Sequence, residues 1–228
     1  MKRAIVIGAT SGIGRALAER LAAEGYRVGV TGRREALLEE LAASRPGSFC
    51  YAAADIMDPA AACAALERLA GELGGMDLCV VSAGTGDLNP GLDYALEEPA
   101  IRTNVVGWTA AVDWAYGRFE ERGGGHLVVI TSVGGLRGGG AAPAYNASKA
   151  YQINYAEGLR QRAAKSGLPL PVTDIRPGFV ATALLRNADY PMLMRPEKVA
   201  ETLFRALECG KRRIVIDHRY ALLVRLWR

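Results

Sequence analysis

Short apolar runs rich in Val and Ile alternate along the chain with Ala- and Leu-rich segments of helical period. Strands buried on both faces are continuously apolar, whereas a helix lying on a sheet repeats its apolar residues every three or four positions. The alternation therefore predicts an α/β fold in which helices cover both faces of a parallel sheet. The predicted strands are Ala4–Ile7, Arg27–Thr31, Ser48–Ala52, Leu78–Ser82, His126–Thr131, Val172–Ile175 and Arg213–Ile216. The predicted helices are Ile13–Glu24, Glu35–Ala43, Pro59–Leu73, Glu98–Arg122, Tyr145–Ser166 and Pro196–Glu208.

The pattern runs through the chain without a repeat, a low-complexity stretch or a linker-like change of composition. We therefore expect one dinucleotide-binding and catalytic domain over residues 1–218, followed by an apolar and basic tail at 219–228. This tail is too short to cross a bilayer. Its Leu, Trp and Arg residues leave two alternatives, contact with a partner subunit or with a membrane surface. We expect subunit contact, because a single short helix binds lipid weakly.

Composition narrows the class of protein. Half of the 228 residues are hydrophobic and 23% are charged, which excludes a disordered chain, a collagen-like repeat and a multi-span membrane protein. The net charge of +4 is too small to favour nucleic acid as a partner. The first apolar run is interrupted by Gly8, unlike a signal peptide, and the four cysteines show no Cys-x-x-Cys spacing, so we expect a cytoplasmic protein. The only two histidines, His126 and His218, offer little material for a metal site or a Ser-His-Asp triad, and no metal is expected.

A glycine-rich motif lies between the first predicted strand and the first predicted helix. It reads Gly8-Ala9-Thr10-Ser11-Gly12-Ile13-Gly14. A tight turn that ends in a helix N-terminus presents free N–H groups and a positive dipole end, which suit a pyrophosphate. The spacing differs from the general G-x-G-x-x-G fingerprint, so the strand–turn–helix context carries the interpretation.

A second motif, Tyr145-Asn146-Ala147-Ser148-Lys149, lies at the start of a predicted helix. Because positions i and i+4 share one helix face, the Tyr145 hydroxyl and the Lys149 ammonium can address one site. Acid-base work near neutral pH requires lowering the tyrosine pKa from about 10, at a cost of roughly 4 kcal/mol. A cation about 5 Å away supplies roughly 3 kcal/mol at an effective dielectric of about 20, so we expect Lys149 to provide most of the shift. The alternative is that Tyr145 and Lys149 are surface residues of an ordinary helix without a role in catalysis.

Taken together, the motifs of the chain resemble the short-chain dehydrogenase/reductase family. They occur in the order and at the spacing of the family, over roughly residues 2 to 217. The motifs are Gly8-x-x-x-Gly12-x-Gly14, Ser82-Ala83-Gly84, Asn104, Ser132, Tyr145-x-x-x-Lys149, and Pro177-Gly178 with Thr182. The resemblance implies a single Rossmann-type domain, with a doubly wound seven-stranded parallel sheet and helices on both faces. It also implies a nicotinamide dinucleotide at the carboxyl ends of the strands and a homodimer or homotetramer.

The resemblance also implies roles for individual residues. Tyr145 falls on the proton donor of the family, and Lys149 on the residue that binds the nicotinamide ribose and lowers the tyrosine pKa. Ser132 would bind the substrate carbonyl, and Asn104 would hold a water that links Lys149 to solvent. Asp55 resembles the acid that contacts adenine, with capping of the next helix as the alternative. Ala83 and Gly84 would let the adenosine half approach, and Pro177, Gly178 and Thr182 would close the pocket near the nicotinamide.

Two positions bear on the cofactor. Ser82 stands where the family usually has Asn, and Ser makes fewer hydrogen bonds. At the end of the second strand, where an acid would bind the ribose hydroxyls of NAD, the chain reads Thr31-Gly32-Arg33-Arg34. Arg33 is placed to pair with a 2′-phosphate, so we expect NADP(H). The alternative is that both arginines merely lie in solvent.

The expected function is an NADP(H)-dependent oxidoreductase that transfers a hydride between nicotinamide and a carbonyl or secondary alcohol. The apolar segment after Gly178 favours a small substrate with a hydrophobic body, without identifying it. Two alternatives from other classes are a non-catalytic NADP(H) sensor and an epimerase or dehydratase on the same fold. Retention of Asn104, Ser132, Tyr145 and Lys149 argues against the sensor.

Overall fold

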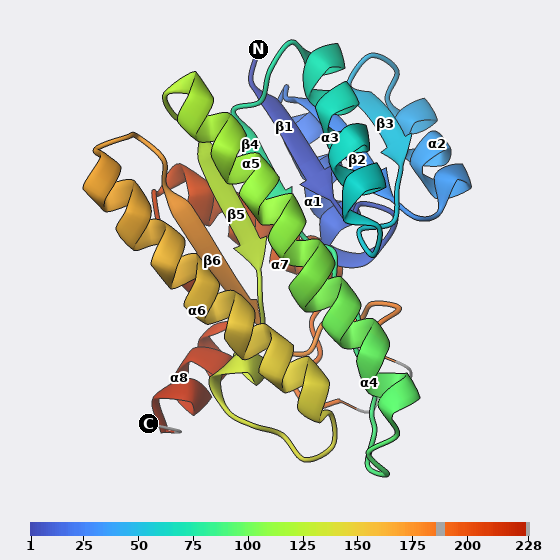
Figure 1. Ribbon diagram of the computed structural model, residues 1–228, viewed down its shortest axis with the longest axis vertical. Coiled ribbons are helices and arrows are strands. Elements are labelled where there is room, and N and C mark those ends of the chain that lie inside the picture. Colours follow the sequence, from blue (N-terminus) through green and yellow to red (C-terminus); the bar gives the residue numbers. More distant parts are fainter. Residues whose placement is uncertain (186–189, 227–228) are drawn as a thin grey trace.

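A computed structural model describes residues 1–185 and 190–226 of the chain. Seven parallel strands form one sheet, as the sequence predicts (Figure 1), and their order is β3-β2-β1-β4-β5-β6-β7. The strands are β1 (Arg3–Ile7), β2 (Arg27–Gly32), β3 (Phe49–Ala53), β4 (Leu78–Val81), β5 (His126–Ile130), β6 (Val172–Pro177) and β7 (Arg213–Ile216). The order reverses between β1 and β4, which is where open α/β sheets bind ligands at the carboxyl ends of their strands.

Helices cover both faces of this sheet, because successive strand residues point to opposite sides. Ala4 and Val6 of β1 pack in one core cluster with residues of α1, α2 and α7, and Ile5 and Ile7 pack in the other with residues of α3, α5 and α6 (Figure 1). The helical segments are α1 (Gly12–Ala23), α2 (Glu35–Ser44), α3 (Pro59–Leu73), α4 (Tyr94–Ile101), η1 (Arg102–Gly107), α5 (Trp108–Arg122), η2 (Val133–Leu136), α6 (Pro143–Ser166), α7 (Pro196–Glu208) and α8 (His218–Leu226).

The helix predicted from Glu98 to Arg122 is longer and less regular in the structure. It begins at Tyr94, where the side chain of Asp93 accepts a hydrogen bond from the N–H of Ala95 at 2.9 Å. Its middle, η1, is a π-helical segment that contains Asn104. Such segments interrupt the regular α-helical ladder and are frequent at functional sites.

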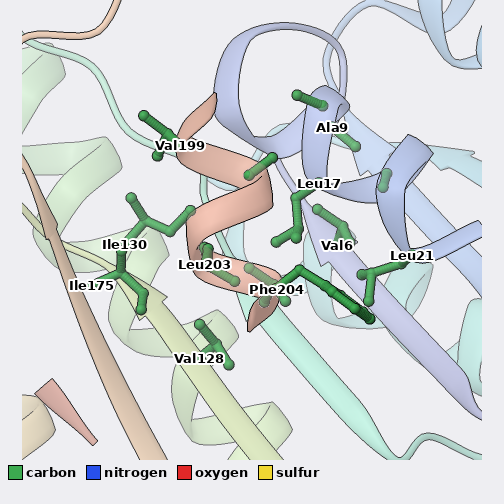
Figure 2. Packing of buried hydrophobic residues seen from close by; sticks show 14 of the residues in the cluster. Val6, Ala9, Leu17, Leu21, Val128, Ile130, Ile175, Val199, Leu203 and Phe204 are labelled. Carbon is green, nitrogen blue, oxygen red and sulfur yellow. The ribbon is translucent and has the colours of Figure 1, made fainter. Parts of the chain in front are cut away.

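The face formed by α1 and α7 gives a direct test of the packing. Leu203 of α7 is fully buried among Leu17, Phe204 and the neighbouring strands (Figure 2). We expect Leu203→Ala to lower the free energy of unfolding by about 2–5 kcal/mol, because it removes buried methyl groups and leaves a cavity. Urea denaturation measures the change. Leu222→Ala is the matched control, since that side chain is 62% exposed, and an equal loss in both variants would contradict the packing.

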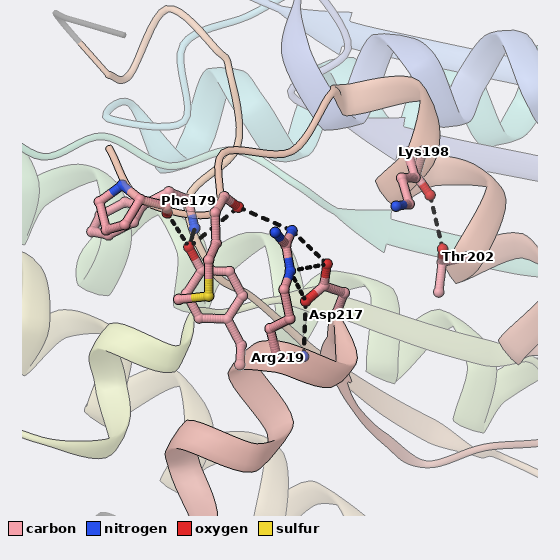
Figure 3. Close-up of polar contacts among 8 residues, drawn as sticks. Phe179, Lys198, Thr202, Asp217 and Arg219 are labelled. Carbon is pink, nitrogen blue, oxygen red and sulfur yellow. Dashed lines mark hydrogen bonds and ion pairs between the residues drawn. The ribbon is translucent and has the colours of Figure 1, made fainter. Parts of the chain in front are cut away.

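The tail begins inside helix α8. Its Tyr220 is buried, donates a hydrogen bond to the carbonyl of Pro191 at 2.9 Å, and accepts one from the N–H of Phe179 at 3.1 Å. Next to it, Arg219 pairs with Asp217 at 2.8 Å (Figure 3). The start of the tail therefore packs on its own chain, a role that the sequence did not indicate. The expected subunit contact stays a prediction, and residues 227–228 lie outside the described residues.

Candidate active site

The glycine-rich turn between β1 and α1 forms a close-packed cradle. Gly8 has a φ of +90°, and a Cβ at this position would lie 2.6 Å from the backbone nitrogen of Ala83. A Cβ at Gly14 would lie 2.1 Å from the carbonyl oxygen of Gly8. Only glycine fits at either position, so the turn brings the first helix end directly against the end of β4.

The N-terminus of α1 has no side-chain cap. Ser11 occupies the N-cap position but makes no capping hydrogen bond with its side chain, and the first turn of α1 contains no acidic residue. Free N–H groups and the positive end of the helix dipole together favour an anion here. The residues present therefore fit the dinucleotide that the motif implies, with its pyrophosphate at this helix end.

The two arginines after β2 point to different partners. The Arg34 guanidinium donates hydrogen bonds to the hydroxyls of Thr10 and Ser11, at 2.8 and 2.6 Å. Arg33 is largely exposed and lies 3.9 Å from Asp55, a weak pair at the surface. Arg34, which sequence reasoning treated as a secondary neighbour, is thus the one that contacts the glycine-rich turn.

Asp55 does not cap the following helix. Its carboxylate accepts a hydrogen bond from the N–H of Met57 at 2.9 Å, within the turn after β3. The cap of α3 is Asp58, which accepts a hydrogen bond from the N–H of Ala61 at 3.1 Å. The capping alternative is therefore wrong, because the N-cap residue of α3 lies three residues after Asp55. Contact of Asp55 with adenine stays a prediction.

Ser132, Tyr145 and Lys149 come together beyond the carboxyl ends of β4 and β5. Ser132 follows β5, and it accepts a hydrogen bond from the N–H of Gly134 at 3.0 Å. Lys149 is only 4% exposed, and its Nζ lies 5.9 Å from the centre of the Tyr145 ring. The ring also lies against Gly86, where a Cβ would come within 2.4 Å of it. The three side chains thus share one site, which the helix spacing predicts for Tyr145 and Lys149 and the family resemblance implies for Ser132.

Electrostatics in this site differ from the expectation. Burial raises the pKa of Tyr145, and a hydrogen bond with Ser132 acts in the opposite direction. Burial lowers the pKa of Lys149 to about 8, opposed by the negative charge of Asp174. The Lys149 ammonium donates to the carbonyl of Ile130 at 3.2 Å and to Gln152 at 2.9 Å. The predicted net lowering of the Tyr145 pKa is therefore not found here, because the effect of burial is the larger one.

Asn104 links this site to the loop after β4. Its carboxamide accepts from the N–H of Thr85 at 2.9 Å and donates to the Thr85 carbonyl at 2.7 Å and to the Ser148 hydroxyl at 3.0 Å. A Cβ at Gly84 would lie 3.3 Å from both Asn104 Oδ1 and Lys149 Nζ. The fully buried Asn104 therefore fixes the loop that carries Ala83 and Gly84 against α6.

The segment after β6 closes the same region from the other side. Thr182 lies against Gly12, where a Cβ would come within 2.9 Å of Thr182 Cγ2. Pro177 ends β6, and the N–H of Gly178 continues the sheet by donating to the carbonyl of Ile216 at 3.0 Å. The structure thus brings Thr182 to the glycine-rich turn, and its role near the nicotinamide stays a prediction.

Gly178 gives a second stability prediction. A Cβ here would lie 2.2 Å from the ring of Tyr220, so we expect Gly178→Ala to push Tyr220 out of its hydrogen bonds to the loop. The expected result is a loss of about 1–3 kcal/mol in unfolding free energy, measured by denaturation. The double variant Gly178→Ala, Tyr220→Ala removes the clash, and its two effects are expected not to add. If the losses of unfolding free energy in the two single variants add up to the loss in the double variant, the two side chains are not in contact.

Sequence reasoning missed Gln152, which binds Lys149 and the backbone of Asn104. Its position three residues after Lys149 placed it on the same helix face, but a glutamine on a helix is too common to signal a role. Sequence reasoning also gave no role to Thr85 and Ser148, whose contacts with Asn104 depend on the tertiary fold. His126 is remote from this site at the start of β5, where burial lowers its pKa to about 4 and it bonds Thr173.

Comparison with known proteins identifies the family. A model of the family described as short chain dehydrogenase matches residues 2–191. An uncharacterized oxidoreductase of Myxococcus xanthus is 34% identical over 232 residues, covering 99% of this chain and 91% of the relative. One from Mycobacterium tuberculosis is 33% identical and covers 85% of this chain and 79% of the relative. The chain belongs to the short-chain dehydrogenase/reductase family, and it is an oxidoreductase with a fold that binds a nicotinamide cofactor.

Solved structures agree with this assignment. A short-chain dehydrogenase from Streptomyces avermitilis has a TM-score of 0.87 and 25% identity, and the match covers 98% of this chain and 91% of that one. Serine dehydrogenase from Escherichia coli has a TM-score of 0.82 and 26% identity, covering 94% and 96%. Actinorhodin polyketide ketoreductase, solved with NADPH, has a TM-score of 0.82 and 25% identity, covering 94% and 95%.

Among the helices within residues 1–185 and 190–226, none combines the length and apolar character that a membrane span needs. The same part of the chain brings together no group of His, Cys, Asp and Glu side chains able to hold a metal ion.

Proposed function

We propose that the protein is an NADP(H)-dependent oxidoreductase acting on a carbonyl or secondary alcohol of a small substrate with a hydrophobic body, with Tyr145 as the general acid and base. The observation that carries the proposal is the meeting of Ser132, Tyr145 and Lys149 at the carboxyl ends of β4 and β5, beside the glycine-rich turn. A Tyr hydroxyl bound to a Ser hydroxyl, with a buried ammonium nearby, suits proton transfer to a carbonyl oxygen.

The cofactor would be held along the switch point of the sheet. The open N-terminus of α1 and the glycines of the turn, Gly8, Gly12 and Gly14, would hold the pyrophosphate, with Thr10, Ser11 and Ile13 flanking it. Ala83 and Gly84 would face the adenosine half, and Asp55 the adenine. Pro177, Gly178 and Thr182 would enclose the nicotinamide half. When bound, the nicotinamide supplies the hydride chemistry of the reaction.

Side chains of the protein would transfer the proton that accompanies the hydride. Ser132 would donate a hydrogen bond to the substrate oxygen and orient it toward the Tyr145 hydroxyl. In reduction of a carbonyl, Tyr145 gives its proton to that oxygen, and in oxidation of an alcohol it accepts one. Two of the three N–H donors of Lys149 are used within the described part of the chain, and the third would serve the ribose or Tyr145. A positive charge here stabilises the tyrosinate, which offsets the effect of burial.

The preference for NADP(H) rests on charge. Arg33 and Arg34 follow β2, and Arg34 already lies against Thr10 and Ser11 of the glycine-rich turn. No carboxylate precedes them at the end of β2, where one would accept hydrogen bonds from the ribose hydroxyls of NAD. Two guanidinium groups at this edge suit a 2′-phosphate.

A screen of carbonyl compounds and alcohols with NADPH and NADP⁺, followed by absorbance of the nicotinamide, tests the proposal. The expected result is cofactor consumption in step with product, with at least one apolar aldehyde or ketone. Conversion of a substrate without net cofactor consumption would instead indicate an epimerase or dehydratase. Tight NADPH binding with no turnover across the screen would indicate a sensor.

A further inference from the structure

A glutamine amide forms part of the buried hydrogen-bond network around Lys149. Gln152 of α6 is fully buried, three residues after Lys149. Its Oε1 accepts a hydrogen bond from Lys149 Nζ at 2.9 Å, and its Nε2 donates one to the backbone carbonyl of Asn104 at 2.8 Å. The side-chain amide therefore spans the gap between Lys149 and the π-helical segment η1.

The orientation of this amide is fixed by chemistry. An ammonium only donates hydrogen bonds, and a backbone carbonyl only accepts them. A bridge between the two needs an acceptor at one end and a donor at the other, which the carboxamide supplies at a fixed separation. Because both bonds are buried, loss of either would leave an unpaired polar group in the interior.

We propose that Gln152 is a positioning residue for Lys149, and that its amide takes the place between Lys149 and Asn104 that the family pattern gives to a water molecule. The amide supplies a neutral acceptor that stabilises the charged form of Lys149. It also ties the position of the ammonium to η1, so that Lys149 and the loop fixed by Asn104 are held as one unit. This inference rests on the proposed function for its catalytic meaning, but the contact itself is tested separately.

The groups that act on Lys149 come from several elements. Asp174 of β6 is buried and raises the pKa of Lys149, while it is itself paired with Arg176 at 2.6 Å and accepts a hydrogen bond from Thr131 at 2.6 Å. Arg160 of α6 interacts electrostatically with Asp174. Tyr145 lies on the same helix as Lys149. Gln152 adds a short, direct hydrogen bond to this field, so its removal is expected to disfavour the charged ammonium.

The test is a titration of Lys149 in the ligand-free protein, by NMR with lysine labelled with ¹³C at Cε. The other lysines, Lys2, Lys165, Lys198 and Lys211, lie exposed at the surface, and the Lys149→Met variant assigns the signal. Burial sets the pKa of Lys149 at about 8. We expect Gln152→Met to lower that pKa by about 1, the loss of one hydrogen bond to a charged group. We expect Gln152→Glu to raise it, because a carboxylate favours the ammonium.

Two controls separate positioning from packing. Gln161→Met removes an exposed amide from the same helix and is expected to leave the Lys149 titration unchanged. If Gln152→Met does not fold, as judged by circular dichroism, the Lys149 pKa in Gln152→Glu still tests the proposal. An unchanged Lys149 pKa in a folded Gln152→Met or Gln152→Glu variant would overturn the proposal.

NADPH binding connects the contact to function. If only the charged form of Lys149 binds the ribose well, Gln152→Met is expected to weaken NADPH about eightfold relative to wild type at pH 8.5, and less than about twofold at pH 6.5. Nucleotide fluorescence measures both constants. Equal weakening at the two pH values would contradict the positioning role. Failure of the wild type to bind NADPH would refute the proposed cofactor and leave the titration result standing.

Discussion

Replacement of Tyr145 by Phe is expected to reduce turnover by about 10²- to 10⁴-fold while leaving NADPH affinity nearly unchanged, once a substrate is in hand. In the proposed mechanism this hydroxyl both donates and accepts the reacting proton, and Phe keeps the ring that lies against Gly86. Steady-state kinetics with the variant measure the loss. Isothermal titration with NADPH shows whether the cofactor site is intact.

A tyrosine on the same helix provides the matched control. The hydroxyl of Tyr151 forms a hydrogen bond with Thr109 at 2.8 Å, on the side of α6 that faces α5. Tyr151→Phe removes the same atom from the same helix, so it is expected to keep most of the activity. Near-native kcat in Tyr145→Phe, or an equal loss in both variants, would refute Tyr145 as the general acid and base.

Most of the sheet was predictable because its strands are buried on both faces. Runs such as Ala4–Ile7 and Leu127–Ile130 are continuously apolar, and the predicted ends of the seven strands lie within two residues of those observed. The start of the long helix at Tyr94 was less predictable. Pro99 favours a helix start nearby, since proline suits the first turn, whereas the structure places it inside α4.

Some features of the site follow from the spacing of residues in the sequence, and others depend on the tertiary fold. The i, i+4 relation was enough to place Tyr145 and Lys149 on one helix face. Burial of Tyr145, which raises its pKa, depends on the tertiary fold, so the electrostatics of Tyr145 were not predictable from spacing. The same holds for Arg33 and Arg34, which are adjacent in sequence but have separate partners because neighbouring side chains leave the backbone in different directions.

Discrimination between NADPH and NADH is expected to depend on these two arginines together. A charge-assisted contact with a 2′-phosphate contributes about 1.5–3 kcal/mol, or roughly ten- to a hundredfold in affinity. We expect wild type to prefer NADPH, and Arg33→Ala and Arg34→Ala each to weaken NADPH far more than NADH. Arg33→Asp is expected to go further, because a carboxylate repels the phosphate and accepts hydrogen bonds from the ribose hydroxyls of NAD.

The double variant Arg33→Ala, Arg34→Ala separates a shared contact from a single one. If both guanidinium groups bind the phosphate, the double variant weakens NADPH more than either single variant does, and only the double variant loses the preference. Arg34 also fixes Thr10 and Ser11, so Arg34→Ala alone is expected to weaken NADH slightly, whereas Arg33→Ala is not. Arg45→Ala, at the far end of α2, controls for the change in net charge. Dissociation constants for both cofactors decide the outcome, and a wild type that prefers NADH, or a double variant that keeps its NADPH preference, would reverse the cofactor assignment.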